Sequence, residues 1–207
     1  MKKLILLTAI AVAMLQTGKA QDSGLTFGLK VGTNLSNIYD SQSDKLTSSS
    51  KFGFVGGAFV GLSLGKYLGI QPEVHFSQKG FVANGSILGT SYSLTRTTNF
   101  IDIPLLLTIK PIPMLTIVVG PQYSYLLSQK DDFSNAVFNT EQNQQFSNDN
   151  IRKNILGGVL GVDLNFDKIV VGLRIGRDFQ NNNGDGTSST PRYKNAWAQA
   201  TLGFKVF

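Results

Sequence analysis

The 207-residue chain contains no cysteine, and this absence excludes two arrangements at once. No disulfide can hold the fold together, and no lipid-modified cysteine can anchor the chain as a lipoprotein. Charged residues are also scarce, at 15% of the chain against about 25% in a typical soluble domain. No long run of lysine or arginine occurs, so the sequence does not support nucleic-acid binding.

Long apolar runs are missing too, apart from one near the N-terminus. Lys2 and Lys3 precede an apolar run from Leu4 to Leu15, which is too short to span a bilayer as a helix. Gly18-Lys19-Ala20 follows it as a small-x-small cleavage sequence. We therefore expect residues 1–20 to be a secretory signal peptide, with a retained membrane anchor as the alternative, and residues 21–207 to form one domain.

What the sequence does contain is a period-two alternation of apolar and polar residues, which is typical of strands with two different faces. In one clear case, Ile169, Val171, Leu173 and Ile175 alternate with Val170, Gly172, Arg174 and Gly176. The pattern predicts eight strands, at about 25–35, 52–64, 68–79, 99–109, 114–127, 154–164, 168–178 and 195–207.

The connections between these segments alternate between two kinds. Short ones fall at 65–67, 110–113 and 165–167, and long polar ones at 36–51, 80–98, 128–153 and 179–194. Strict alternation places all the long loops at one end of a meander. The sequence therefore predicts an all-β fold, an eight-stranded antiparallel up-and-down β-barrel with short turns and long loops at opposite ends.

Period two alone does not say which face points inward, and a soluble lipocalin-like barrel would place the apolar face inside. The polar face carries charged residues near strand middles and many glycines, which would weaken the exposed side of a soluble sheet. Inside a transmembrane barrel, the glycines make room for charged side chains that need partners. We therefore expect an interior polar network with a structural role, comprising Lys30, Glu73, His75, Asp102, Asp163, Arg174 and Lys205.

Aromatic residues favour the transmembrane interpretation as well. If the first strand ascends, Phe52, Phe54, Tyr123 and Tyr125 lie toward the loops, and Phe27, Tyr67 and Phe204 lie toward the turns. Two aromatic girdles around an apolar band are expected of outer-membrane barrels.

Several segments resemble the PorT-like outer-membrane β-barrel family of Bacteroidota. They are Leu68–Gly80 (LGIQPEVHFSQKG), Phe100–Leu107 (FIDIPLLL), Gly28–Ser36 (GLKVGTNLS) and Gly120–Tyr123 (GPQY). The resemblance covers essentially the whole chain after the signal. It implies an eight-stranded outer-membrane barrel with both termini and the short turns in the periplasm and the long loops outside the cell. The member that names the family is associated with a protein secretion and gliding machinery.

Two constellations could carry chemistry. Glu73, His75 and Ser77 share one strand face and bring together an acid, a base and a nucleophile, but residues two apart on a strand lie about 6.5–7 Å apart. Outer-membrane lipid A deacylases place such a set on the lipid-facing surface, whereas this trio lies in the inward register. The segment 181–187 is rich in Asn, Asp and Gly like a calcium loop, but Arg192 stands where an EF-hand needs Glu. We expect no enzymatic activity, no catalytic residue, no cofactor and no bound metal.

The sequence thus predicts an integral outer-membrane protein with a structural role or a role in adhesion or partner binding through its four long loops. The alternatives are a subunit of an envelope transport or secretion assembly and, less favoured, a lipid-modifying hydrolase. The expected partners are outer-membrane lipid and lipopolysaccharide, the barrel-assembly machinery during biogenesis, and an extracellular or envelope protein. Phe207 resembles the terminal aromatic of a barrel-assembly signal, although its register does not match the apolar register of the last strand.

Overall fold

The computed structural model describes residues 24–39, 47–87, 90–135, 139–143, 151–182 and 193–206. The expected signal peptide and Phe207 lie outside these ranges. The described strands are β1 (Leu25–Tyr39), β2 (Thr47–Ser63), β3 (Leu68–Ile87), β4 (Thr90–Ile112), β5 (Leu115–Asn135), β6 (Asn139–Asn143), β7 (Asn154–Phe166), β8 (Ile169–Asp178) and β9 (Lys194–Lys205). Within these ranges, no helix is long and apolar enough to span a membrane.

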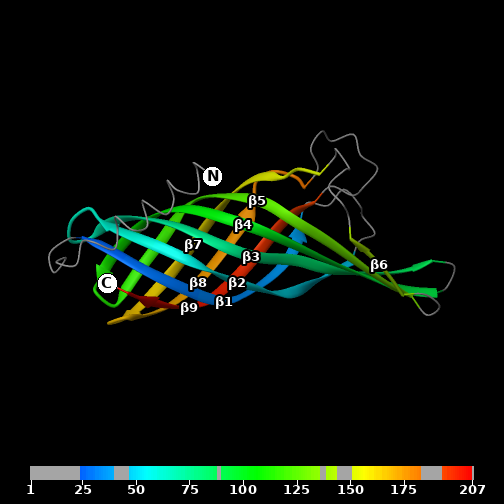
Figure 1. The fold of residues 1–207 in the computed structure, drawn as a ribbon, viewed down its shortest axis with the longest axis horizontal. Helices are drawn as coiled ribbons and strands as arrows, with labels where there is room; N and C mark the ends of the chain where they lie inside the picture. The colour runs from blue at the N-terminus through cyan, green and yellow to red at the C-terminus, as the bar shows by residue number, and fades with distance from the viewer. Residues whose placement is uncertain are drawn as a thin grey trace, which may run out of the picture.

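Eight of the strands close into a ring (Figure 1). Their order is β4-β3-β2-β1-β9-β8-β7-β5, all neighbours are antiparallel, and a β4–β5 pairing completes the circle. The first and last barrel strands meet along β1 and β9, from Gly28 opposite Lys205 to Tyr39 opposite Lys194. Among the described strands, the short strand β6 has β5 as its one partner and pairs with the last part of it. The predicted eight-stranded antiparallel barrel is therefore confirmed.

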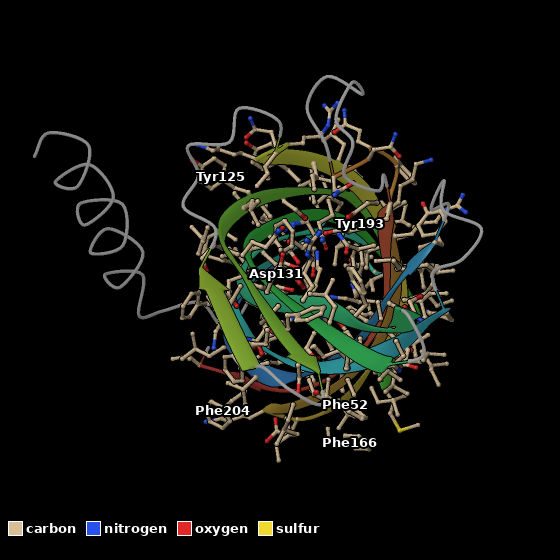
Figure 2. The ribbon with its side chains drawn as sticks, turned by 90° about the vertical axis from the view of Figure 1, so that its right-hand side faces the viewer. Phe52, Tyr125, Asp131, Phe166, Tyr193 and Phe204 are labelled. Carbon is tan, nitrogen blue, oxygen red and sulfur yellow. The ribbon has the colours of Figure 1, made fainter. Side chains whose placement is uncertain are left out.

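The barrel wall is apolar outside and largely polar inside. On β8, the side chains of Leu173 and Ile175 are 52% and 59% exposed, whereas the intervening Arg174 is 4% exposed. Large aromatic side chains ring the outer surface. Figure 2 shows Tyr125, Phe166 and Phe204 outside the ring of strands and Asp131 and Tyr193 within it. This arrangement is the reverse of a lipocalin-like barrel, which the structure rules out.

The interior also contains an apolar layer that the sequence analysis did not predict. Leu106, Val118, Val159 and Trp197 are buried and form one cluster inside the barrel. They occupy the inward register that we expected to be polar, and they come from four different strands. Each looks like an isolated exception in its own segment, so strand-by-strand reading does not reveal the layer.

The strands β3, β4 and β5 are much longer than predicted. β4 has 23 residues and β8 has 10, which correspond to about 75 and 33 Å at the usual rise per residue. A membrane-spanning strand needs only about 9–11 residues. The prediction of a loop over 80–98 was wrong, because β3 and β4 pair across that range up to Ile87 and Thr90. Within the predicted 128–153 loop, β5 continues to Asn135 and β6 follows.

The reason for this error is physical. The period-two test looks for an apolar outward face, which a strand needs only where it contacts lipid. Beyond the lipid-facing band, both faces of a strand can be polar, and the alternation disappears although the pairing continues. These extensions are residues 80–87, 90–98 and 128–135 together with β6, which we call the projecting sheet. In Figure 1 the projecting sheet runs far past the ends of β8 and β9.

Candidate functional site

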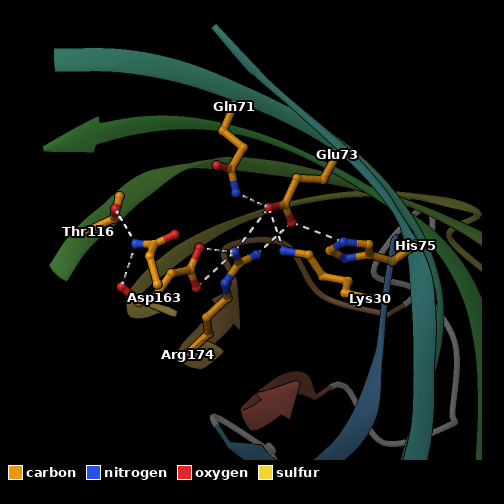
Figure 3. A network of polar contacts seen from close by, with 8 residues as sticks. Lys30, Gln71, Glu73, His75, Thr116, Asp163 and Arg174 are labelled. Carbon is orange, nitrogen blue, oxygen red and sulfur yellow. Dashed lines mark hydrogen bonds and ion pairs between the residues drawn. The ribbon is translucent and has the colours of Figure 1, made fainter. Parts of the chain in front are cut away.

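In the barrel interior, the carboxylate of Glu73 on β3 is the shared partner of several side chains (Figure 3). Lys30 Nζ from β1 lies 2.7 Å from Glu73 Oε1, and Arg174 Nη1 from β8 lies 2.5 Å from Glu73 Oε2. Arg174 Nη2 also donates to Asp163 of β7, 3.0 Å from Oδ2. These four side chains, which come from four strands, form what we call the central network.

The central network is closed to water and balanced in charge. The four side chains are each no more than 4% exposed. Two cations face two carboxylates, so each buried charge has an opposite charge beside it, and the large cost of an unpaired buried charge is avoided. The Gln71 side chain also donates to Glu73 Oε1 at 2.7 Å. Each member of the network therefore depends on its partners for charge balance.

Glycines give the central network its space, as the sequence analysis expected for this face. A Cβ added to Gly161 would lie 2.6 Å from Cγ of Arg174, and one added to Gly172 would lie 2.8 Å from Oδ1 of Asp163. Both distances are far shorter than any normal contact. The two glycines therefore let the Arg174–Asp163 pair form between neighbouring strands.

Asp102 lies in a separate ion pair. Lys79 Nζ is 2.9 Å from Asp102 Oδ2, and both side chains are almost completely buried. The same ammonium group lies 3.9 Å from the ring centroid of Trp197 and 4.9 Å from that of Phe100. Lys79 thus joins the charged interior to the apolar layer through cation–π contacts. The sequence analysis did not select Lys79, although it shares its strand face with Glu73.

Lys205 is not part of either group. It ends β9 at the turn end of the barrel and is only partly buried. It lines a small cavity of about 60 Å³ together with Lys30, Lys110 and Asp163. Of the seven residues predicted for the interior network, the structure brings Lys30, Glu73, Asp163, Arg174 and His75 together, places Asp102 with Lys79, and leaves Lys205 at the mouth.

The Glu73–His75–Ser77 trio does not have the geometry of a nucleophilic site. His75 Nε2 lies 2.9 Å from Glu73 Oε2, closer than the spacing along the strand suggested. Ser77 Oγ instead accepts a hydrogen bond from Asn34 Nδ2 at 3.0 Å, and no hydrogen bond joins His75 to Ser77 among the described residues. A general base must reach the nucleophile that it activates.

No group of three or more His, Cys, Asp or Glu side chains able to hold a metal occurs in the part of the chain that the structure describes. The segment 181–187, which resembles a calcium loop in composition, lies mostly outside that part. Of the described residues there, Asn182 accepts a hydrogen bond through Oδ1 from the backbone N–H of Tyr193 at 3.0 Å. This contact ties the end of the β8 segment to the start of β9.

The projecting sheet has its own salt bridge, far from the central network. Arg96 Nε and Nη2 donate to the two oxygens of Asp131 at 2.7 and 2.6 Å, which is a bidentate pair between β4 and β5. Arg96 Nη1 also donates to the Tyr193 hydroxyl at 3.2 Å. The guanidinium lies between the rings of Phe81 and Tyr193, at 5.8 and 5.7 Å.

A small apolar cluster surrounds this salt bridge. Phe81, Ala83 and Tyr193 are buried, and Ile38 and Leu94 pack against them. Burial raises the pKa of the Tyr193 phenol, although the charge of Arg96 opposes the rise. The guanidinium pKa of Arg96 is raised, because Tyr193 and Asp131 outweigh the effect of its burial. The projecting sheet therefore has a packed core, unlike a solvated loop.

The sequence analysis missed Arg96 and Tyr193, and placed Asp131 only in a loop. A usable signal existed, because Phe81 and Ala83 continue the inward register of β3 beyond Lys79. On β5 the register is harder to follow. A register shift between Ser128 and Leu126, opposite Asn99 and Phe100, moves the inward face from Leu126 to Gln129 and Asp131.

A closed barrel with an apolar outer wall, aromatic girdles and charges buried inside defines a transmembrane β-barrel. The family model for the outer membrane protein beta-barrel domain matches residues 18–184. The chain therefore belongs to that family and is an integral protein of the outer membrane. Barrels of the outer membrane have short turns on the periplasmic side and longer connections outside the cell, and by this rule the projecting sheet belongs on the extracellular side.

Solved structures with a similar fold include neisserial surface protein A (10% identity, 88% of this chain and 97% of that chain, TM-score 0.44). They also include the attachment invasion locus protein Ail of Yersinia pestis (9% identity, 88% and 99%, TM-score 0.42). A third is the N-terminal β-barrel domain of Pseudomonas aeruginosa OprF (9% identity, 86% and 96%, TM-score 0.40). No curated protein matches the chain significantly.

Proposed function

We propose that this outer-membrane barrel is non-enzymatic and binds a partner outside the cell through its projecting sheet. The observation that carries the proposal is the packed core around Arg96 and Asp131, which lies beyond the lipid-facing band. Anchoring in the membrane does not require this core, because the eight strands already close below it. A rigid polar surface does need it, since binding to a preformed surface costs less ordering entropy.

The barrel interior supports a structural role for the central network rather than a catalytic one. Its members are buried, mutually paired and positioned beneath an apolar layer. An interior of this kind holds strands together and excludes water. We also propose that residues 1–20 are a cleaved signal peptide and that the chain is a PorT-like member of its family, which the quoted sequence segments support. A role as an assembly subunit is the competing proposal.

Site-specific photo-crosslinking in living cells separates these proposals. A photoreactive residue is placed at Ser134, which is exposed on the projecting sheet, and at Lys66, which is exposed in a periplasmic turn. Partner binding outside the cell predicts adducts from Ser134 with molecules added from outside or carried by neighbouring cells. Adducts from Lys66 with envelope proteins, and none from Ser134, would overturn the proposal and favour the assembly subunit.

A further inference from the structure

One cation on the outer wall has no explanation in the barrel itself. Arg177 of β8 is exposed and lies between Ile175 and Phe179 in the outward register, whose side chains are 59% and 56% exposed. Arg177 makes no side-chain hydrogen bond or ion pair within the described ranges. An arginine on the lipid-facing wall is strongly destabilising at the bilayer midplane and is tolerated near the interface. Its side chain therefore belongs at the headgroups.

A second cation follows on the neighbouring strand. Arg177 is opposite Ala196 of β9, and Lys194 lies two residues further toward the extracellular end in the same register. Lys194 Nζ is 5.8 Å from the ring centroid of Tyr39. The acidic residues of β7, β8 and β9 are Asp163 and Asp178, and both are buried inside the barrel. The outer face of these three strands is therefore positive near the extracellular leaflet.

Directly beneath the two cations, the wall is hollowed. A depression of about 830 Å³ includes Arg177 and Phe179, and it reaches across Gly158, Ala196 and Ala198. These three residues are small and outward-facing, whereas larger apolar side chains such as Leu35, Leu160 and Ile175 line the same depression. A second depression of about 610 Å³ shares these three larger residues and continues toward Leu173 and Ala200. Both volumes lie in the range of about 300–1,000 Å³ that ligand sites occupy, and both linings are mostly apolar.

We infer that this face binds a lipid of the outer leaflet that carries both phosphate and acyl chains, as lipopolysaccharide does. Arg177 and Lys194 contact the phosphate, and an acyl chain lies over Gly158, Ala196 and Ala198. The occupant follows from two independent features. Lipid is the medium that covers the wall at this depth, and the exposed Arg177 together with the partly exposed Lys194 selects an anionic headgroup over a neutral one. The site is separate from the projecting sheet, so a test of lipid binding does not depend on the proposed function.

Native mass spectrometry of the purified barrel in neutral detergent can test the site. The probes are diphosphorylated lipid A, the same lipid without phosphates, and phosphatidylethanolamine. The intact barrel should retain the phosphorylated lipid in preference to the other two. The double variant R177Q/K194Q should lose this preference, with binding about tenfold weaker, because charge-assisted contacts are among the stronger hydrogen bonds. Binding should also weaken as salt rises.

Matched variants make the result decisive. K66Q/K168Q removes two exposed cations at the periplasmic turns and should leave lipid binding unchanged. Ala198→Phe fills the depression and should weaken binding of the phosphorylated lipid while Arg177 and Lys194 remain. Each variant must first show the heat-modifiable gel migration of a folded barrel. Equal retention of the phosphorylated and dephosphorylated lipids by the intact barrel, or no effect of R177Q/K194Q, would overturn the inference.

Discussion

The charge balance of the central network leads to a quantitative prediction. In the variant Glu73→Gln, Lys30 and Arg174 keep their charges but share only the Asp163 carboxylate, since Glu73 is the direct partner of both. Glutamine has nearly the shape of glutamate, so packing hardly changes. Breaking a buried pair by removing one partner typically costs about 3–5 kcal/mol. We expect the free energy of unfolding to fall by about that amount.

A second substitution should recover much of the loss. In the double variant E73Q/K30M, the surplus cation is gone and the Arg174–Asp163 pair remains as a neutral unit. Methionine keeps most of the length of the Lys30 stem, whose ammonium lies 4.8 Å from the Phe59 ring centroid. The double variant should therefore be more stable than Glu73→Gln alone, by about 2 kcal/mol or more, because coupled sites in one network are not additive.

Urea unfolding of the barrel in lipid vesicles, followed by tryptophan fluorescence and by gel migration, measures these differences. Lys66→Met provides a control, because it removes an exposed cation at a turn and should change stability by less than about 0.5 kcal/mol. The reasoning fails if Glu73→Gln costs less than about 1 kcal/mol or if adding Lys30→Met increases the cost.

Three further predictions concern other parts of the barrel. Gly161→Ala places a Cβ 2.5 Å from a backbone carbonyl oxygen of β8 and should lose about 1–3 kcal/mol in the same assay, whereas Gly61→Ala meets nothing closer than 3.5 Å and should be tolerated. Arg96→Leu leaves Asp131 without its bidentate partner, so limited proteolysis should cut the projecting sheet while the barrel keeps its gel migration; an uncut sheet would contradict the role of this pair. Burial raises the pKa of Tyr193 above 10, the ordinary value for a tyrosine phenol. Hydrogen-exchange protection around Tyr193 should therefore stay constant below pH 10 and decline as the pH rises through the higher pKa of the folded state. A loss of protection near pH 8 would contradict a raised pKa.

The lipid-facing part of the fold was predictable because lipid imposes a strict rule on it. Outward residues there must be apolar, so Leu173 and Ile175 mark β8 in the sequence as clearly as in the structure. The same rule identified Glu73 and Arg174 as inward residues. Their pairing was not predictable, because it depends on the stagger between β3 and β8, which are 101 residues apart at this contact.

The projecting sheet was not predictable for the opposite reason. Outside the membrane, the outward face of a strand contacts water and need not be apolar. Residues such as Thr95 and Thr97 therefore suit a loop as well as a sheet. Arg96 and Asp131 become partners only through the β4–β5 register and the shift near Leu126. Similarly, in the sequence Trp197 is a single aromatic residue in a polar register. Its apolar neighbours come from three other strands, which the sequence pattern does not bring together.

The core of the projecting sheet also has a consequence for folding. It joins Ile38 near the start of the barrel, Phe81 in the middle, and Tyr193 next to the last strand. Tyr193 reaches this position only when β9 pairs with β1 along the seam of the barrel. The packed core outside the membrane is therefore complete only when the ring has closed. A barrel that fails to close would display a loose sheet, so the order of that sheet reports on completed assembly.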